Sequence, residues 1–86
     1  MLFSVQVEIM LRDGVSDAEG ATTERALPRL GFEGISDVRI GRSVRFRIES
    51  ADESSARAAV TDLCERFLTN PAIEDATFTL DPEGTA

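Results

Sequence analysis

The chain has 86 residues, of which nine are basic and sixteen acidic, and its formal net charge is −7. A chain of this length supports one domain that buries roughly 60% of the surface its unfolded form exposes. The acidity disfavours binding to nucleic acids and to anionic membranes, because their phosphate groups would be repelled. Lysine and histidine are absent, and without histidine the chain lacks the commonest general base and metal ligand. We expect a cytoplasmic protein without a leader or membrane-spanning segment.

The first predicted element is a strand from Phe3 to Leu11, because apolar and polar residues alternate along it. The loop that follows, residues 12–20, contains three carboxylates. Their spacing matches no hard-cation loop, so we interpret them as turn and capping residues. The same acids argue against an acylphosphatase-like activity, which would need basic and amide groups there to hold phosphate.

A helix is expected next, with Asp17 as its cap and its end near Leu30. Two residues weaken it. Gly20 costs about 1 kcal/mol relative to alanine, and Pro28 removes a backbone hydrogen bond. We therefore predict a bend or a 3₁₀-like turn near residues 24–28.

The most distinctive stretch then alternates apolar residues with arginines and is interrupted once, at residues 41–43. This pattern predicts a hairpin of two strands joined by a three-residue loop, which pairs Ile40 with Val44. That register places Arg39 opposite Arg45. Like charges directly across a ladder are unfavourable by about 0.2–1 kcal/mol unless an acid lies close, so this face should have partners.

The second helix is predicted to start either with Asp52 as the cap or with a capping box of Ser50 and Glu53. An uninterrupted apolar stripe at helical spacing should face the core. It consists of Ala56, Ala59, Val60, Leu63, Cys64, Phe67 and Leu68. We interpret Cys64 as a small buried hydrophobe rather than a reactive thiol. The segment Asn70-Pro71 should end the helix.

A last strand runs from Ile73 to Leu80, and the tail from Asp81 to Ala86 is expected to be frayed. The element order is β-α-β-β-α-β. It predicts a single domain over residues 1–80 with an α+β, ferredoxin-like βαββαβ fold, in which a four-stranded antiparallel sheet of order 4-1-3-2 carries both helices on one face.

The other face of this sheet should be open and polar. In the predicted register Arg45 and Arg47 lie near Glu8 and Gln6, so Glu8 would supply an acidic neighbour for the arginines. Such a face is either simply solvated or a protein interface. It is not an RNA-binding surface, since its central strands lack stacking aromatic residues.

Five segments together resemble the PurS family, the small subunit of formylglycinamidine ribonucleotide (FGAM) synthase. The segments are residues 14–20, the motifs E-R-A-L and L-G-F at residues 24–27 and 30–32, S-D-V-R-I-G-R at 36–42, E-R-F-L with N-P at 65–71, and I-E-D at 73–75. The hairpin and the Asn-Pro segment are the specific parts. Ala18 and Glu19 depart from the family's usual Pro-Gln, and Ala21 stands where a basic residue is frequent.

The resemblance implies a subunit without catalytic residues or a cofactor or metal site of its own. ATP, magnesium and glutamine would be used by two larger partners, an ATP-dependent synthetase subunit and a glutaminase subunit. The small subunit would associate with itself as a dimer or higher homo-oligomer, bridge the two partners and support ammonia transfer between them. The residues predicted to contact partners are Arg39, Gly41, Arg42, Asn70, Pro71, Glu74 and Asp75.

Purely structural roles are the alternative for several of these residues. Gly41 and Arg42 could serve only a turn, and Asn70 and Pro71 only a helix stop. A different function, a regulatory module that binds a small metabolite between subunits on the same scaffold, is also compatible with the predicted fold.

Overall fold

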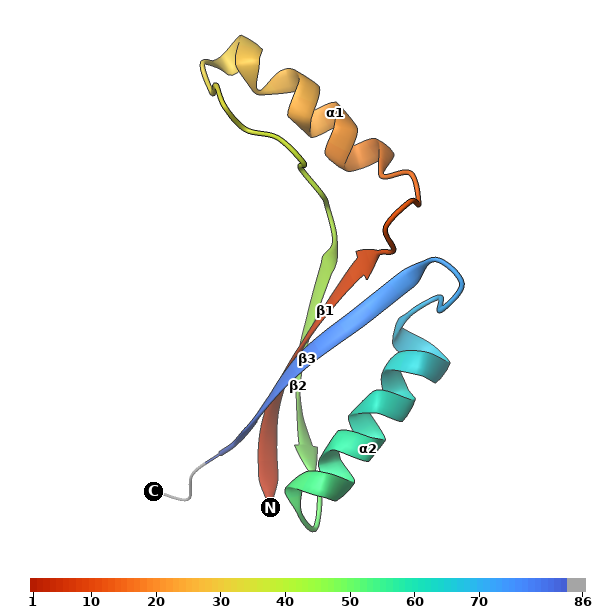
Figure 1. Cartoon of the computed structure of the whole chain (residues 1–86). Coiled ribbons are helices and arrows are strands. Elements are labelled where there is room, and N and C mark those ends of the chain that lie inside the picture. The colour runs from red at the N-terminus through yellow and green to blue at the C-terminus, as the bar shows by residue number, and fades with distance from the viewer. Residues whose placement is uncertain (84–86) are drawn as a thin grey trace.

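The computed structural model describes residues 1–83, which form an elongated molecule with principal extents of 51 × 34 × 14 Å (Figure 1). In chain order the elements are β1 (Leu2–Leu11), α1 (Ala18–Ala26), the 3₁₀ helix η1 (Pro28–Leu30), β2 (Arg42–Glu49), α2 (Glu53–Leu63), the π-helical turn η2 (Cys64–Leu68) and β3 (Glu74–Pro82). The strands form one antiparallel sheet in the order β2-β1-β3.

The core lies between β1 and α2, where the alternation of the first strand takes effect. Phe3, Val5, Val7 and Ile9 of β1 are all buried, and the polar residues between them point to the other face. Ala56 and Val60 of α2 and Cys64 of η2 cover them, and Leu80 closes the core from β3. Cys64 is thus a buried free cysteine, as predicted, and burial, with a smaller contribution from Glu65, raises the pKa of its thiol.

Helix α2 begins at the cap that the sequence offered first. The Asp52 carboxylate accepts a hydrogen bond from the Ser55 N–H at 2.7 Å, which satisfies one of the free donors of the first turn. The contact also lowers the pKa of Asp52. The capping-box alternative with Ser50 and Glu53 is therefore not needed to explain the start of this helix.

The prediction of an uninterrupted apolar stripe facing the core was wrong at Ala59, which is exposed, and again at the end of the helix. After Leu63 the helix widens into the π-turn η2, in which the Thr69 N–H donates to the Cys64 carbonyl at 3.0 Å. The wider turn carries Leu68 onto the core and leaves Phe67 80% exposed. An α-helical turn would have kept Phe67 aligned with Val60 and Cys64, so the π-turn exchanges the two side chains.

The prediction of a four-stranded sheet in the order 4-1-3-2 was also wrong. Three strands keep the expected neighbours, but residues 33–41 form no strand, and the hairpin with its loop at 41–43 does not exist. Gly34 has φ +79° and Asp37 has φ +56°, so the backbone enters the left-handed region twice where a strand would have to be extended.

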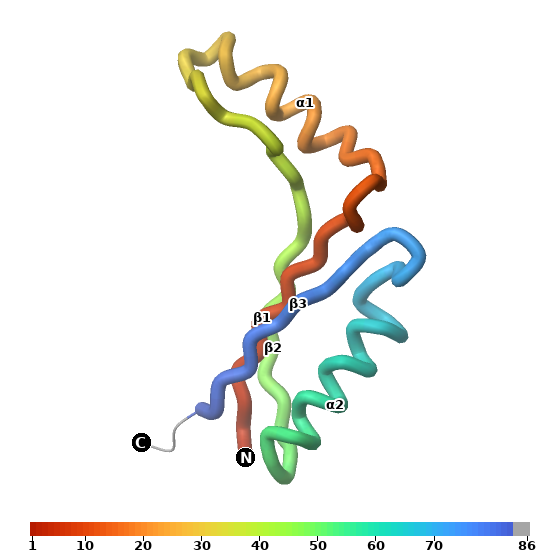
Figure 2. Tube along the Cα trace, in the orientation of Figure 1, coloured from red at the N-terminus to blue at the C-terminus, as the bar shows by residue number. Residues whose placement is uncertain are grey.

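Side chains of the first helix hold this segment instead. The Val38 N–H donates to Glu24 Oε1 and the Ile40 N–H donates to Asp17 Oδ2, both at 2.9 Å. Residues 32–41, here called the return segment, therefore run back alongside α1, as Figure 2 shows. The carboxylates supply the acceptors that a neighbouring strand would have supplied, and this explains why an alternating sequence forms no ladder.

Asp17, α1, η1 and the return segment together form an arm, residues 17–41, that projects beyond the sheet (Figure 1). The expectation that both helices cover one face of the sheet was wrong, because only α2 does so. Gly20 is the one buried residue of α1. A Cβ added there would come within 2.6 Å of Asp17 Oδ2 and would also collide with the Val38 carbonyl. Glycine lets the return segment approach the helix closely.

Two smaller predictions were also wrong. Arg45 and Arg47 lie opposite Gln6 and Ser4, two residues away from the predicted register. The predicted frayed tail from Asp81 to Ala86 begins too early, because Asp81 pairs with Ser4 and β3 continues to Pro82. The last part of that tail, residues 84–86, lies outside the described residues. None of the helices in residues 1–83 has the length and apolarity to cross a membrane.

Candidate functional site: a cluster at one end of the sheet

The structure brings five of the seven predicted contact residues to one place. Arg42 opens β2, Asn70 and Pro71 lie in the connection after η2, and Glu74 and Asp75 open β3. Antiparallel pairing of β2 and β3 with β1 aligns these strand starts at the same end of the sheet, because Ile9 pairs with Arg42 and Leu11 with Glu74. Residues far apart in the sequence thus form one cluster.

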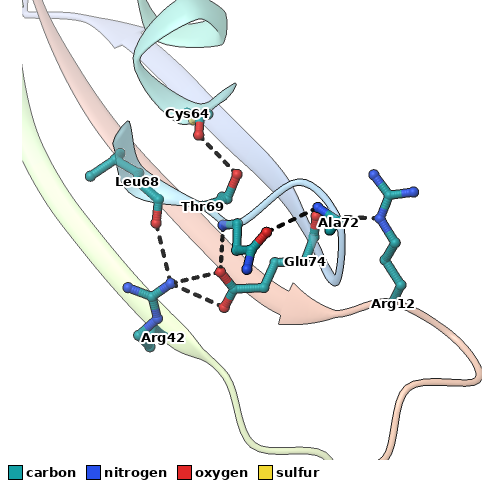
Figure 3. Close-up of polar contacts among 8 residues, drawn as sticks. Arg12, Arg42, Cys64, Leu68, Thr69, Ala72 and Glu74 are labelled. Atoms are coloured by element: carbon teal, nitrogen blue, oxygen red, sulfur yellow. Dashed lines mark hydrogen bonds and ion pairs between the residues drawn. The ribbon is translucent and has the colours of Figure 1, made fainter. Parts of the chain in front are cut away.

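Arg42 and Glu74 form the centre of this cluster (Figure 3). One terminal nitrogen of Arg42 lies 3.1 and 3.0 Å from the two Glu74 carboxylate oxygens and 3.2 Å from the Leu68 carbonyl. Glu74 Oε1 also accepts from the Asn70 N–H at 2.8 Å. The side chain of Glu74 is only 16% exposed, whereas that of Arg42 is 57% exposed and still reaches solvent.

These contacts hold Glu74 in its ionised form. The hydrogen bond from the Asn70 N–H, followed by that from Arg42, lowers the pKa of the Glu74 carboxyl, although desolvation by burial acts in the opposite direction. The carboxylate therefore joins the start of β2 to the connection between η2 and β3. Removing it would leave the guanidinium and the Asn70 N–H without their shared acceptor.

Asn70 shapes the connection itself. Its side-chain oxygen accepts from the Ala72 N–H at 3.2 Å, and its backbone carbonyl accepts from the N–H groups of Ile73 and Glu74 at 3.0 and 2.8 Å. Pro71 occupies the next position, where its fixed φ suits a turn. The turn role that the sequence allowed for Asn70 and Pro71 is thus visible in their hydrogen bonds, and it places both residues beside Glu74.

Arg12 was missed at the sequence level. Its Nε lies 3.2 Å from Asp75 Oδ1 and 3.5 Å from the Glu74 carbonyl, so it ties the end of β1 to the start of β3. Beside it lies an open cleft of about 450 Å³, lined among others by Thr61, Cys64 and Phe78. The position of Arg12 directly after the first strand was visible in the sequence. Its contact with Asp75 could be inferred only from the register of β3 against β1.

Arg39 and Gly41 have other surroundings. Arg39 donates to Asp13 Oδ1 at 2.7 Å and to the Leu11 carbonyl, so it fastens the base of the arm to the end of β1. Gly41 passes close over β1, and a Cβ there would collide with the Met10 sulfur and lie 2.5 Å from the Ile9 carbonyl. Gly41 is needed for this close approach, whereas Arg39 lies outside the cluster around Glu74.

The described residues contain no group of three or more carboxylate, thiol or imidazole side chains placed to hold a metal ion. The polar groups of the cluster act on one another and on the backbone of the connection. The arrangement holds the start of β2, the end of η2 and the connection to β3 together, and it leaves the side chain of Arg42 half-exposed. The absence of catalytic residues in this chain remains a prediction.

Comparison with known proteins gives a consistent result. A family model described as PurS, phosphoribosylformylglycinamidine (FGAM) synthase, matches residues 4–82. The PurS subunit of FGAM synthase from Mycobacterium leprae is 38% identical over 77 residues, which are 90% of this chain and 94% of that protein. The Synechocystis PurS subunit is 32% identical over 76 residues, or 88% of this chain and 76% of that protein.

Solved structures agree with these matches. A Thermotoga maritima PurS crystal structure superposes with a TM-score of 0.86 at 28% identity and covers 93% of this chain and 92% of that one. A chain in a structure of PurLQS from the same organism gives a TM-score of 0.87 at 28% identity, covering 93% and 98% of the two chains.

The fold and the site thus define a small α+β protein. Charged side chains such as Arg42 and Arg12 connect its strands at one end of the sheet and remain partly exposed to solvent. The chain belongs to the PurS family, whose members are subunits of FGAM synthase in purine biosynthesis.

Proposed function

We propose that this chain is the small, non-catalytic subunit that joins the glutaminase and the ATP-dependent synthetase subunits of FGAM synthase and supports the passage of ammonia between them. Glutamine, ATP and magnesium are used by those two partners and not by this chain. The protein works in the cytoplasm and associates with itself. Seven residues contribute to the contacts with partner subunits, and Arg42 is the most important of them. They are Arg39, Gly41, Arg42, Asn70, Pro71, Glu74 and Asp75.

One observation carries this proposal. The chain superposes over 93% of its length on 98% of a chain in the PurLQS structure, with a TM-score of 0.87. A superposition this complete leaves too few residues outside it to omit the arm, the sheet or α2. A chain with the whole shape of a subunit from a multi-subunit structure is suited to the same kind of assembly.

Self-association is supported by the arm. Leu30 is 70% exposed and Phe32 55% exposed, and Ile35 and Ile40 are also among the exposed large apolar residues. Burial of apolar surface is worth about 25 cal/mol per Å², so an uncovered arm forgoes much of this stabilisation. A second copy that covers the arm would supply the packing that α1 lacks against its own sheet.

The direct test mixes this chain with the two larger subunits of its organism, glutamine, Mg²⁺ and adenine nucleotide, followed by mass-resolved size-exclusion chromatography. We expect one assembly containing all three proteins. We also expect glutamine-dependent FGAM formation to fall when this chain is left out, while turnover with ammonium salt in place of glutamine is maintained. Equal glutamine-dependent rates with and without the chain would overturn the proposal.

Arg42→Ala tests the proposed contact residue in the same assay. We expect the variant to fold and to co-elute less with the larger subunits, because it removes the half-exposed guanidinium and loosens the connection that Glu74 holds. Arg45→Ala is the matched control, since Arg45 is an exposed arginine on the same strand. Co-elution of Arg42→Ala at the level of the control would remove Arg42 from the proposed interface.

A further inference from the structure

Strand β2 lies at one edge of the sheet and has a neighbouring strand on one side only. In an antiparallel pair, every second residue directs its N–H and C=O groups to the neighbouring strand, and the residues between direct theirs away from it. The Ser50 N–H donates to the Met1 carbonyl at 2.8 Å and continues the register of β1 and β2, so the backbone groups of even-numbered β2 residues point to β1. Those of Ser43, Arg45 and Arg47 therefore form an open edge.

The return segment has a free side of the same kind. The N–H groups of Val38 and Ile40 are taken up by the carboxylates of Glu24 and Asp17. Adjacent residues of an extended chain direct their backbone groups to opposite sides, so those of Arg39 point away from α1. They have no hydrogen-bond partner within residues 1–83. The return segment and β2 thus both present the backbone of odd-numbered residues.

These two free sides cannot meet within one chain. The return segment leads into β2 without a turn, as Figure 1 shows, and a segment cannot lie beside the strand that it continues. The other edge of the sheet belongs to β3, which is separated from β2 by β1. A segment that pairs with the β2 edge must therefore come from another chain.

We propose that two copies of this chain exchange their return segments, so that the return segment of each copy pairs antiparallel with the β2 edge of the other. The inference rests on the self-association in the proposed function. A two-fold axis makes the two contacts identical, and exchange of equal elements is a low-cost route to a dimer. The axis passes at Arg42, whose charge Glu74 neutralises. In this register the opposite pairs are Asp37 with Arg47, Val38 with Phe46, Arg39 with Arg45, and Ile40 with Val44.

The apolar side chains fit this register. Val44 and Phe46 lie half-buried at the border of the core, and Ile40 is 37% exposed on the arm. Residues directly opposite each other in an antiparallel pair share one face of the sheet. Val38 and Ile40 of one copy would therefore extend the apolar face of β2 in the other copy, and both sets of side chains would lose contact with water.

The charges also select a second copy. Asp37 forms no ion pair within residues 1–83, and it comes opposite Arg47, whose side chain is 69% exposed. Arg39 comes opposite Arg45, but the Asp13 carboxylate lies 2.7 Å from Arg39 and is 99% exposed, so it supplies the acid that two facing arginines need. One chain thus carries both halves of a complementary contact.

Residue-resolved amide exchange, measured by NMR on the chain alone at high and low concentration, tests this pairing. In the oligomer we expect slow exchange at both odd- and even-numbered residues of β2. In the dissociated chain the Arg45 amide should exchange about tenfold faster or more, because its N–H then faces water, whereas the amides of Val44 and Phe46 stay protected by β1. An Arg45 amide that exchanges fast in the oligomer would overturn the inference.

Charge reversal tests the register. Arg47→Glu and Asp37→Lys should each weaken the dimer about tenfold, because each brings like charges together at both symmetric contacts. The double variant should return to within about threefold of wild type, since the pair is then restored in reverse. Arg66→Glu is the matched control, because Arg66 is a similarly exposed arginine with one ion pair in its own chain. No recovery in the double variant, with folding confirmed by circular dichroism, would overturn the proposed pairing.

The outcomes separate this inference from the proposed function. A chain that stays monomeric at every concentration would overturn both the inference and self-association. A β2 edge that becomes protected only when a larger subunit is added would assign the edge to that subunit and overturn the inference alone. Failure to assemble with the larger subunits, in a chain that shows the expected exchange pattern, would overturn the bridging role while supporting the inference.

Discussion

The sheet with α2 and the arm are stabilised in different ways. In the sheet with α2, eight buried apolar residues pack against one another across β1, β3 and the helix. In the arm, α1 buries a single glycine, and the segments are joined mainly by carboxylates that accept backbone N–H groups. One part of this chain therefore carries its own core, whereas the other is held together by polar contacts and lacks a core.

The largest expected effect comes from the core of the sheet. Ile9→Ala should lower the free energy of unfolding by about 2–5 kcal/mol, because it opens a cavity beneath a residue that is 1% exposed. Urea denaturation of the purified chain measures it. Ile35→Ala, on the arm, is the matched control and should change the unfolding of the monomer by no more than about 0.5 kcal/mol. Equal losses at the two positions would show that Ile35 in the arm is packed as firmly as Ile9 in the sheet.

Gly20→Ala should disturb the arm and leave the sheet intact. Alanine favours a helix by about 1 kcal/mol over glycine, but its methyl group would collide with the Val38 carbonyl and Asp17. We expect faster amide exchange in residues 17–41, measured by hydrogen–deuterium exchange, with unchanged exchange in β1. Thr22→Ala, at an exposed position of α1, is the control. Slower exchange in the arm of Gly20→Ala would show that the close approach is absent.

Glu74→Gln should make stability less dependent on pH. The pKa of Glu74 is lowered in the folded chain, so its carboxylate stabilises the fold above its ordinary pKa near 4.5 and this contribution is lost as the pH falls through the lowered value. The temperature of thermal unfolding should therefore fall less steeply in the variant than in wild type as the pH is lowered from about 5 to 3. Glu8→Gln is the control, because Glu8 forms no ion pair within residues 1–83. An identical slope in wild type and Glu74→Gln would contradict the role of Glu74.

The smallest effect is expected for Arg39→Ala. Its contact with Asp13 is a surface ion pair, and Asp13 is 99% exposed, so global unfolding should hardly change. The base of the arm should nevertheless become more mobile, because the contact with the Leu11 carbonyl is lost as well. Amide exchange of residues 38–41 reports this change. A large drop in the unfolding temperature would mean that the arm shares the core of the sheet.

The sheet with α2 and the arm also differ in how well they could be predicted from the sequence. The alternation from Phe3 to Leu11 and the helical spacing of Ala56, Val60 and Cys64 report burial against the core, and these elements formed as expected. Residues 37–40 also alternate, but carboxylates of Glu24 and Asp17 satisfy their backbone, and no periodicity of side chains reports such a contact. The strand prediction for these residues was therefore wrong, because the side-chain pattern does not reveal polar contacts between distant segments.

The site was predictable to a similar extent. Arg42, Asn70 and Glu74 were named from the family resemblance, and the register of the sheet then brought them together. Arg12 was missed because its contact with Asp75 depends on the same register. The exposure of Phe67 could not be predicted, since one π-type hydrogen bond decides which of two adjacent apolar residues faces the core.

The difference between the two regions is tested most directly by hydrogen–deuterium exchange over a dilution series of the chain alone, with chromatography reporting its mass. We predict that amides of the arm, residues 17–41, lose protection as the oligomer dissociates, whereas amides of β1, β3 and α2 keep theirs. Protection of the arm that remains unchanged in the fully dissociated chain would contradict this prediction, because the arm would then be stable without a second copy.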